Sequence, residues 1–241
     1  MTERILVSRK GDVTTLTLNR PDDGNRVSTD MGHEFVRLFA LAAEDGSKAI
    51  VLRGNGADFC LGRDSAGVAA GKQGESALEI RARNADPALA FYDSFLTTPV
   101  PIIGAVQGLA DGMGAALAAL CDITVAADTA RFRVPEMERD IPPALVMTAF
   151  RDRVPRKAIG YLVWSRDEID AMAARECGIV NRVVPEAALD AEVDALTGRL
   201  EGNSMESIRM IKEYLNNALG MERGAAISYA SNLMSATMSS K

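Results

Sequence analysis

The sequences DFCLGRD at residues 58–64 and GLADGMGAA at residues 108–116 decide the fold. Each follows a short apolar run, Ala49–Arg53 and Ile102–Val106, which predicts a buried strand. Each also has glycine where the chain must turn sharply after that strand. A run of small residues, Ala115–Leu120, follows the second turn and predicts a helix. This order of strand, turn and helix predicts an α/β fold with right-handed crossovers.

The chain before the second turn predicts a hairpin, a capped helix and a longer helix. Lys10-Gly11-Asp12 is the turn between two alternating runs, and Ser28 is a favourable N-cap. Pro99 and Pro101 end the longer helix. The predicted elements are strands Ile5–Ser8 and Val13–Asn19, a helix Thr29–Ala43, a loop Ala57–Ala69 and a helix Ser76–Leu96.

The chain beyond the second turn changes character after Pro142-Pro143. Strands are expected at Asp122–Ala126 and Ala130–Val134, and the rest is mostly helical apart from a strand at Ile179–Val184. We therefore divide the chain into an α/β core, residues 1–185, and a helical region, residues 186–241. The predicted helices are Leu145–Asp152, Arg156–Trp164, Asp170–Glu176, Glu186–Leu200, Met205–Ala218 and Glu222–Met238.

The composition argues against several function classes. Of the 241 residues, 47% are hydrophobic and 25% charged, as in ordinary soluble proteins. A net charge of −6 argues against a nucleic-acid partner. No apolar run reaches the ~20 residues of a membrane span and no signal-peptide core is present, so we expect a soluble cytoplasmic protein without a membrane partner. One histidine, His33, and three scattered cysteines predict no metal site.

The two glycine turns can bind an anion with backbone N–H groups. The second turn opens a helix, whose first N–H groups have no partner within the helix and lie at its positive end. Two such N–H groups that converge on one point form an oxyanion hole, which stabilises a thioester oxygen when the α-carbon loses a proton. One glycine turn after a strand is ordinary, whereas two in this order favour the functional interpretation.

The motifs of this chain, taken together, resemble those of the crotonase (enoyl-CoA hydratase/isomerase) superfamily. The similarity runs from about residue 4 to about residue 217, and the motifs are specific in combination. The matching stretches are Phe59–Asp64 (F-x-x-G-x-D), Gly108–Leu117 (a glycine triplet), Cys121-Asp122-Ile123, Phe132–Glu136 (F-x-x-P-E) and Ala174–Val180 followed by Val184-Pro185.

The resemblance implies a crotonase-like spiral of ββα units with a helical C-terminal region that forms a homotrimer or a dimer of trimers. It implies a bent pocket for an acyl-CoA thioester, with coenzyme A as part of the substrate and no metal or redox cofactor. It also assigns the oxyanion hole to the N–H groups of Arg63 and Met113. Met113 departs from the family pattern because it replaces a glycine.

The acid–base residues of the family are matched only in part. Family hydratases typically use two glutamates, and the corresponding positions here are Ala116 and Glu136. Hydration needs two groups that move protons, whereas one base can move a double bond by taking a proton from C2 and returning it at C4. We therefore favour double-bond isomerisation with Glu136 as the base. Hydration is the nearest alternative.

Three nearby carboxylates are candidates for a second acid: Glu138, Asp140 and Asp111. We expect Glu138 and Asp140 to be surface charges and Asp111 to cap the helix that starts at Gly112. A non-catalytic acyl-CoA-binding paralogue is a rival hypothesis, which Ala116, Met113 and an atypical C-terminal tail support. A hydrolase would need a nucleophile–base pair, and the sequence offers none.

Further residues complete the predicted binding surface. The residues predicted to bind the CoA ester are Arg26, Gly62, Asp64 and Gly112, and Asp64 is also expected to tie its own loop. Lys212 either contributes positive charge near the CoA or is a surface residue. We expect Tyr161 and Trp164 to be packing residues of the helical region.

Overall fold

The computed structural model describes residues 3–64 and 74–239. Its centre is a six-stranded sheet in the order β1-β2-β3-β4-β6-β9. β1 and β2 form the predicted antiparallel hairpin, and the later neighbours are parallel. The strands are β1 (Ile5–Lys10), β2 (Val13–Leu18), β3 (Ala49–Gly54), β4 (Ile102–Val106), β6 (Ile123–Ala127) and β9 (Arg182–Val184). The predicted loop Ala57–Ala69 lies outside the described residues from position 65 onward.

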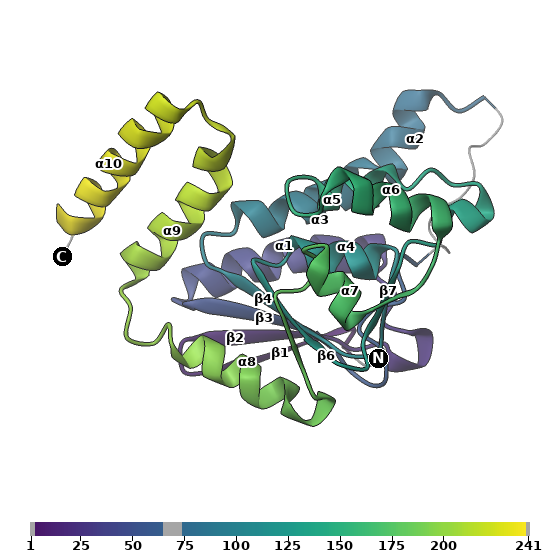
Figure 1. The fold of residues 1–241 in the computed structure, drawn as a ribbon, viewed down its shortest axis with the longest axis horizontal. Coiled ribbons are helices and arrows are strands. Elements are labelled where there is room, and N and C mark those ends of the chain that lie inside the picture. The colour runs from purple at the N-terminus through teal and green to yellow at the C-terminus, as the bar shows by residue number, and fades with distance from the viewer. Residues whose placement is uncertain (1–2, 65–73, 240–241) are drawn as a thin grey trace.

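Helices cover both faces of this sheet (Figure 1). The helices α1 (Thr29–Glu44), α3 (Asp86–Thr97) and α4 (Met113–Leu120) lie over one face, and α8 (Leu189–Gly198) packs against β4 and β6 on the other. Coverage on both sides explains why β3 and β4 are almost continuously apolar in sequence, since side chains pointing either way are buried.

Helix α1 begins as predicted and packs its apolar stripe against α3. The hydroxyl of Ser28 accepts a hydrogen bond from the N–H of Met31 at 3.2 Å, which satisfies one free donor of the first turn. Phe35 of α1 stacks on Phe91 of α3 with ring centroids 5.2 Å apart. Phe39 meets the edge of Phe95 at 5.0 Å. These rings form an aromatic layer between the two helices and hold α3 in place above the sheet.

The single helix predicted for Ser76–Leu96 is wrong, because the chain forms two helices there. α2 spans Ala77–Asn84 and α3 starts at Asp86. Pro87 sits in the first turn of α3, where its missing N–H costs nothing. Inside a continuous helix, the same ring would clash with the carbonyl four residues earlier. Pro87 therefore breaks the helix, although the apolar pattern runs through it.

A second, three-stranded sheet lies beside the main sheet, in the order β5-β7-β8. Its strands are β5 (Leu109–Asp111), β7 (Arg131–Arg133) and β8 (Ile169–Asp170). The sequence predicted β7 but not β5 or β8, because these two strands are too short to show an alternation of apolar and polar residues. β5 and β7 are parallel and place Asp111 directly opposite Arg133.

The C-terminal half is mostly helical, as predicted. Figure 1 shows α9 and α10 standing away from the sheet, at the yellow end of the chain. The predicted helix Glu186–Leu200 is a 3-10 turn, Glu186–Ala188, followed by α8. The division at residue 185 stays a prediction. The other helices are α5 (Ala144–Phe150), α6 (Arg156–Ser165), α7 (Ala171–Glu176), α9 (Met205–Asn217) and α10 (Arg223–Ser239).

Lys212 joins the α9–α10 region to the core and is not a surface residue. It is 3% exposed, and its ammonium group donates to the backbone oxygen of Phe95 at 2.8 Å and to Asp122 at 2.7 Å. The Asp122 carboxylate also accepts a bond from the N–H of Ile102 on β4 at 2.7 Å. The ammonium group therefore uses its three N–H donors on Phe95 and the two oxygens of Asp122, and none is left to bind a ligand.

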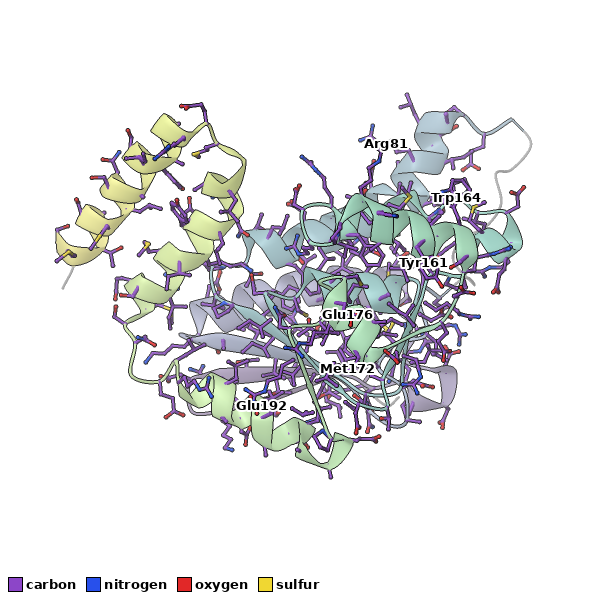
Figure 2. All side chains as sticks on the ribbon, viewed as in Figure 1. Arg81, Tyr161, Trp164, Met172, Glu176 and Glu192 are labelled. Carbon is purple, nitrogen blue, oxygen red and sulfur yellow. The ribbon has the colours of Figure 1, made fainter. Side chains whose placement is uncertain are left out.

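The packing role predicted for Tyr161 and Trp164 is also wrong for a single chain. Both belong to α6 (Figure 2), and they are 55% and 73% exposed. The Tyr161 hydroxyl donates to Asp167 at 2.7 Å. The helix itself was predicted correctly, but its buried residues are Leu162 and Val163.

In residues 3–64 and 74–239, no helix is both long enough and apolar enough to cross a bilayer.

Candidate active site

The two glycine turns lie against each other and form one unit. Cys60 and Ala110 make an isolated parallel bridge, in which the N–H of Cys60 donates to the oxygen of Leu109 at 3.2 Å and the N–H of Asp111 donates to the oxygen of Cys60 at 2.9 Å. The Asp58 carboxylate accepts a further bond from the N–H of Leu109 at 2.9 Å. Two segments about fifty residues apart in sequence are therefore held in one register.

Glycine is required at two of these positions because the segments touch. A Cβ added to Gly114 would lie 2.0 Å from the backbone oxygen of Cys60. A Cβ on Gly108 would lie 2.0 Å from the oxygen of Ala57, and Gly108 also has a φ of +57°. No side chain fits at either distance, so both glycines allow the close approach of the two turns.

A third segment, around Asn25, fixes the first turn from the other side. Asn25 is fully buried, and its amide nitrogen donates to the oxygens of Asn55 and Asp58, each at 2.8 Å. Val27 bridges to Arg63 through two backbone bonds of 3.0 Å, to the oxygen of Gly62 and from the N–H of Asp64. The backbone around Arg63 is thus held on both sides.

The backbone N–H groups of Arg63 and Met113 have no hydrogen-bond partner within the described part of the chain. Met113 is the first residue of α4, so its N–H faces outward from the positive end of that helix. The two turns are close here, since a Cβ on Gly62 would lie 3.9 Å from the Met113 nitrogen. Two unused donors on adjacent turns can receive one oxygen atom that carries negative charge.

The carboxylate of Glu136 lies directly over the second turn. A Cβ on Gly112 would be 2.5 Å from Oε1 of Glu136. Oε2 is buried and has no hydrogen-bond partner among the described residues. Burial, and then the negative charge of Asp111, raise the pKa of Glu136. A carboxylate with a free, buried oxygen and a raised pKa is suited to accept a proton.

Asp111 is not the helix cap that the sequence predicts. Gly112 occupies the N-cap of α4 and no side chain caps it. Asp111 instead pairs with Arg133 through both oxygens, at 3.2 and 3.1 Å. Arg133 also reaches Glu138 at 3.5 Å. The sequence missed this pair because the register of β5 and β7 brings its members together.

All seven residues that the sequence assigned to catalysis or CoA-ester binding line one cavity of about 660 Å³. Asp111 and Glu138 also line it, whereas Asp140 is not among its lining residues. Ala116 is fully buried in α4 and carries no titratable group. The predicted residues on the cavity wall are Arg26, Gly62, Arg63, Asp64, Gly112, Met113 and Glu136.

The side chains of the predicted binding residues are mostly engaged in holding loops. Asp64 accepts a bond from Arg20 at 3.0 Å, which agrees with a structural role. The Arg63 guanidinium donates to the backbone oxygen of Asn84 at the end of α2, at 2.6 Å. Arg26 donates to the oxygen of Asp23 at 3.1 Å, and both residues line the cavity.

Among the cavity residues that the sequence did not predict are two with polar side chains, Tyr92 on α3 and Arg133 on β7. Tyr92 lies on the buried face of a helix, where the sequence pattern cannot separate a packing ring from a ring that reaches a cavity. Arg133 sits inside the F-x-x-P-E motif, but its contact with Asp111 depends on strand register.

The sequence model of the enoyl-CoA hydratase/isomerase family matches residues 8–241. The chain belongs to this family. It is 33% identical over 183 residues to the 2,3-dehydroadipyl-CoA hydratase of Escherichia coli, a match that covers 75% of this chain and 69% of the relative. It is 29% identical over 194 residues to human enoyl-CoA delta isomerase 2, covering 79% of this chain and 48% of that protein.

Solved structures agree with this family assignment. The crystal structure of an enoyl-CoA hydratase from Mycobacterium smegmatis superposes with a TM-score of 0.90 at 28% identity, covering 98% of this chain and 91% of the other. The predicted fold class, a crotonase-like α/β fold with C-terminal helices, is therefore confirmed.

Proposed function

We propose that this family member is an acyl-CoA-processing enzyme that moves a double bond from position 3 to position 2 of an enoyl-CoA ester. The observation that carries the proposal is the environment of Glu136. Its carboxylate has a free buried oxygen and lies over a turn with an unused backbone donor. The other glutamate position of family hydratases is Ala116 in this chain, which cannot carry a proton.

In the proposed mechanism, the N–H groups of Arg63 and Met113 bind the thioester oxygen. They stabilise the enolate that forms when C2 loses a proton, and one donor of this kind is typically worth about 3–4 kcal/mol. Glu136 accepts the proton from C2 and returns it at C4, so the reaction balances without a second acid. The raised pKa of Glu136 makes it a stronger base than an exposed carboxylate.

Hydration of a 2-enoyl-CoA is the second candidate. It is favoured by the name of the Escherichia coli relative, a hydratase, and by the presence of Asp111 in the same cavity. Hydration would require Asp111 to hold a water together with Glu136. Both Asp111 oxygens are already bonded to Arg133, which makes isomerisation the simpler use of this site.

The remaining expectations belong to this proposal. Coenzyme A enters as part of the substrate, no metal or redox cofactor takes part, and the protein works in the cytoplasm. We also propose a homotrimer or dimer of trimers, because α9 and α10 leave large apolar side chains exposed. Among these, Ile211 of α9 and Ile227 and Met234 of α10 are 54%, 61% and 58% exposed. Light scattering after size-exclusion chromatography would give the number of chains.

The test is a spectrophotometric assay of the purified protein with a 3-enoyl-CoA and a 2-enoyl-CoA, run beside Glu136→Gln. We expect the wild type to convert the 3-enoyl ester to the conjugated 2-enoyl thioester. The rate should be about 10²- to 10⁴-fold lower in Glu136→Gln. Loss of the 2-enoyl chromophore would indicate the hydratase. Tight binding of both esters without turnover would indicate a non-catalytic acyl-CoA-binding protein.

A further inference from the structure

Tyr92 has an environment that the proposed reaction does not use. It is 4% exposed and lines the same cavity as Glu136. No hydrogen bond joins its hydroxyl to any residue in the described ranges 3–64 and 74–239, yet the hydroxyl oxygen is not one of the fully buried side-chain atoms without a partner. Since the residue lines the cavity, the hydroxyl is open to the cavity, where water or a ligand can bond to it.

The neighbours of Tyr92 show that packing alone does not require the hydroxyl. The rings of Phe35, Phe39, Phe91 and Phe95 form the rest of the aromatic layer around α3, and all four are phenylalanines. Tyr92 contacts Phe91 with ring centroids 6.3 Å apart. Phenylalanine at position 92 would keep this packing without a polar atom to satisfy. The hydroxyl is therefore the part of the side chain that needs an explanation.

The hydroxyl lies among the groups of the active site. Tyr92, Arg63 and Glu136 line the same cavity, and the charges of Glu136 and Arg63 both act on the Tyr92 phenol. Burial, and then the charge of Glu136, raise the pKa of Tyr92. The phenol consequently stays protonated at neutral pH and offers a hydrogen-bond donor to whatever fills the cavity.

An aliphatic acyl chain would leave this donor unpaired in the complex. It would also displace water from the hydroxyl, so the desolvation would be uncompensated. A site that hydrogen-bonds a polar group of its substrate discriminates strongly against the analogue that lacks the group. The Asp111–Arg133 pair also lines this cavity and adds further polar groups to its wall.

We propose that Tyr92 is a specificity-determining residue that donates a hydrogen bond to an oxygen atom on the acyl group, so that the substrate is an acyl-CoA whose chain carries a hydroxyl, keto or carboxylate oxygen. This inference rests on the proposed function, because it assumes that an acyl-CoA ester fills the cavity. It goes beyond that function by naming the class of acyl group.

The experiment compares a plain 3-enoyl-CoA with esters of the same chain length that carry a hydroxyl, keto or carboxylate oxygen beyond the double bond. Wild-type protein should prefer an oxygenated ester by about 10- to 100-fold in kcat/KM. In Tyr92→Phe this ratio should fall by a similar factor. The matched control is Tyr161→Phe, an exposed tyrosine on α6 whose hydroxyl is bonded to Asp167, and it should leave the ratio unchanged.

The outcomes separate this inference from the function on which it rests. Turnover of all esters at equal kcat/KM by the wild type would overturn the role of Tyr92 and leave the isomerase standing. Equal loss on every ester in Tyr92→Phe would also overturn it, because the hydroxyl would then act on the thioester that all substrates share. Calorimetry with the saturated esters measures the preference for the oxygenated ester as a ratio of binding constants, without turnover. Failure to bind any of these esters would overturn the proposed function itself.

Discussion

Two regions of this molecule bury an ionisable side chain, and they treat it in opposite ways. At the junction of α9 with the core, Lys212 is bonded to Asp122 and to the backbone oxygen of Phe95. In the cavity, Glu136 has one oxygen without any partner among the described residues. Burial lowers the pKa of Lys212, and Asp122 opposes that shift. Burial raises the pKa of Glu136, and Asp111 adds to the shift.

The difference separates a structural joint from a reactive group. A buried charge with all its hydrogen bonds satisfied holds two elements together and has nothing left to offer. A buried carboxylate with a free oxygen gains by taking a proton from something else. The following four changes test this distinction, from the largest expected effect to the smallest.

Lys212→Met should destabilise the protein strongly, because the Asp122 carboxylate, only 14% exposed, would lose its charged partner. Breaking a buried pair in this way costs about 3–5 kcal/mol of unfolding free energy. Urea unfolding at neutral pH measures it. The control is Lys10→Met, which removes an exposed pair with Asp194 and should not move the midpoint. Equal, small effects of both changes would mean that the α9 junction is not a structural joint.

Gly112→Ala should impair catalysis, because the new methyl group would meet the Glu136 carboxylate at 2.5 Å and displace it. A displacement of this size should lower kcat/KM by about 10- to 100-fold. Gly11→Ala is a matched control, because Gly11 has a similar φ of +58° but open space around it. It reports the backbone strain alone. If both variants keep full activity, the position of Glu136 over the turn is unimportant for the reaction.

Asp111→Asn should move the acid limb of the pH–rate profile to lower pH. Glu136 acts as a base only when ionised, so kcat/KM rises with pH through its pKa. Asp111 raises that pKa, and removing its charge therefore lowers it. Glu138→Gln serves as the control, because Glu138 is the other partner of Arg133. A limb that stays in place in Asp111→Asn would mean that another group sets the profile.

Glu136→Gln should raise the thermal midpoint at neutral pH, the smallest of the four effects. The folded-state pKa of Glu136 is raised, so its contribution to stability is present at low pH and is lost as the pH rises through that value. Glutamine is neutral throughout and avoids this loss. Thermal scans should show a higher unfolding midpoint for Glu136→Gln than for the wild type at neutral pH, and a smaller difference between the two at acidic pH. A lower midpoint at neutral pH would instead mark Glu136 as a structural residue.

The sequence predicted those features that depend on short-range patterns. Ser28 followed by an amphipathic stretch predicted α1 and its cap, and the continuous apolar runs predicted β3 and β4. The seven proposed site residues share one cavity, because the family motifs fix the order of the turns even where single residues vary. Pro87 was a local signal for the break between α2 and α3, but the apolar pattern outweighed it.

The errors concern contacts between segments that are distant in the sequence. Asp111 was assigned to the helix beside it, whereas the strand register gives it to Arg133. Lys212 was expected either near the CoA or at the surface, whereas it is buried and bonded to Asp122, 90 residues away. Tyr92 carried no signal at all, since a tyrosine on a buried helix face is ordinarily a packing residue.

The contact between the two glycine turns has a consequence for how this site can change over time. Because Gly108 and Gly114 face the carbonyls of Ala57 and Cys60 at distances that exclude any side chain, a shift in either turn must be matched by the other. The two halves of the proposed oxyanion site are thus inherited as a pair. An attempt to graft one turn from a relative into this chain would have to carry its counterpart along.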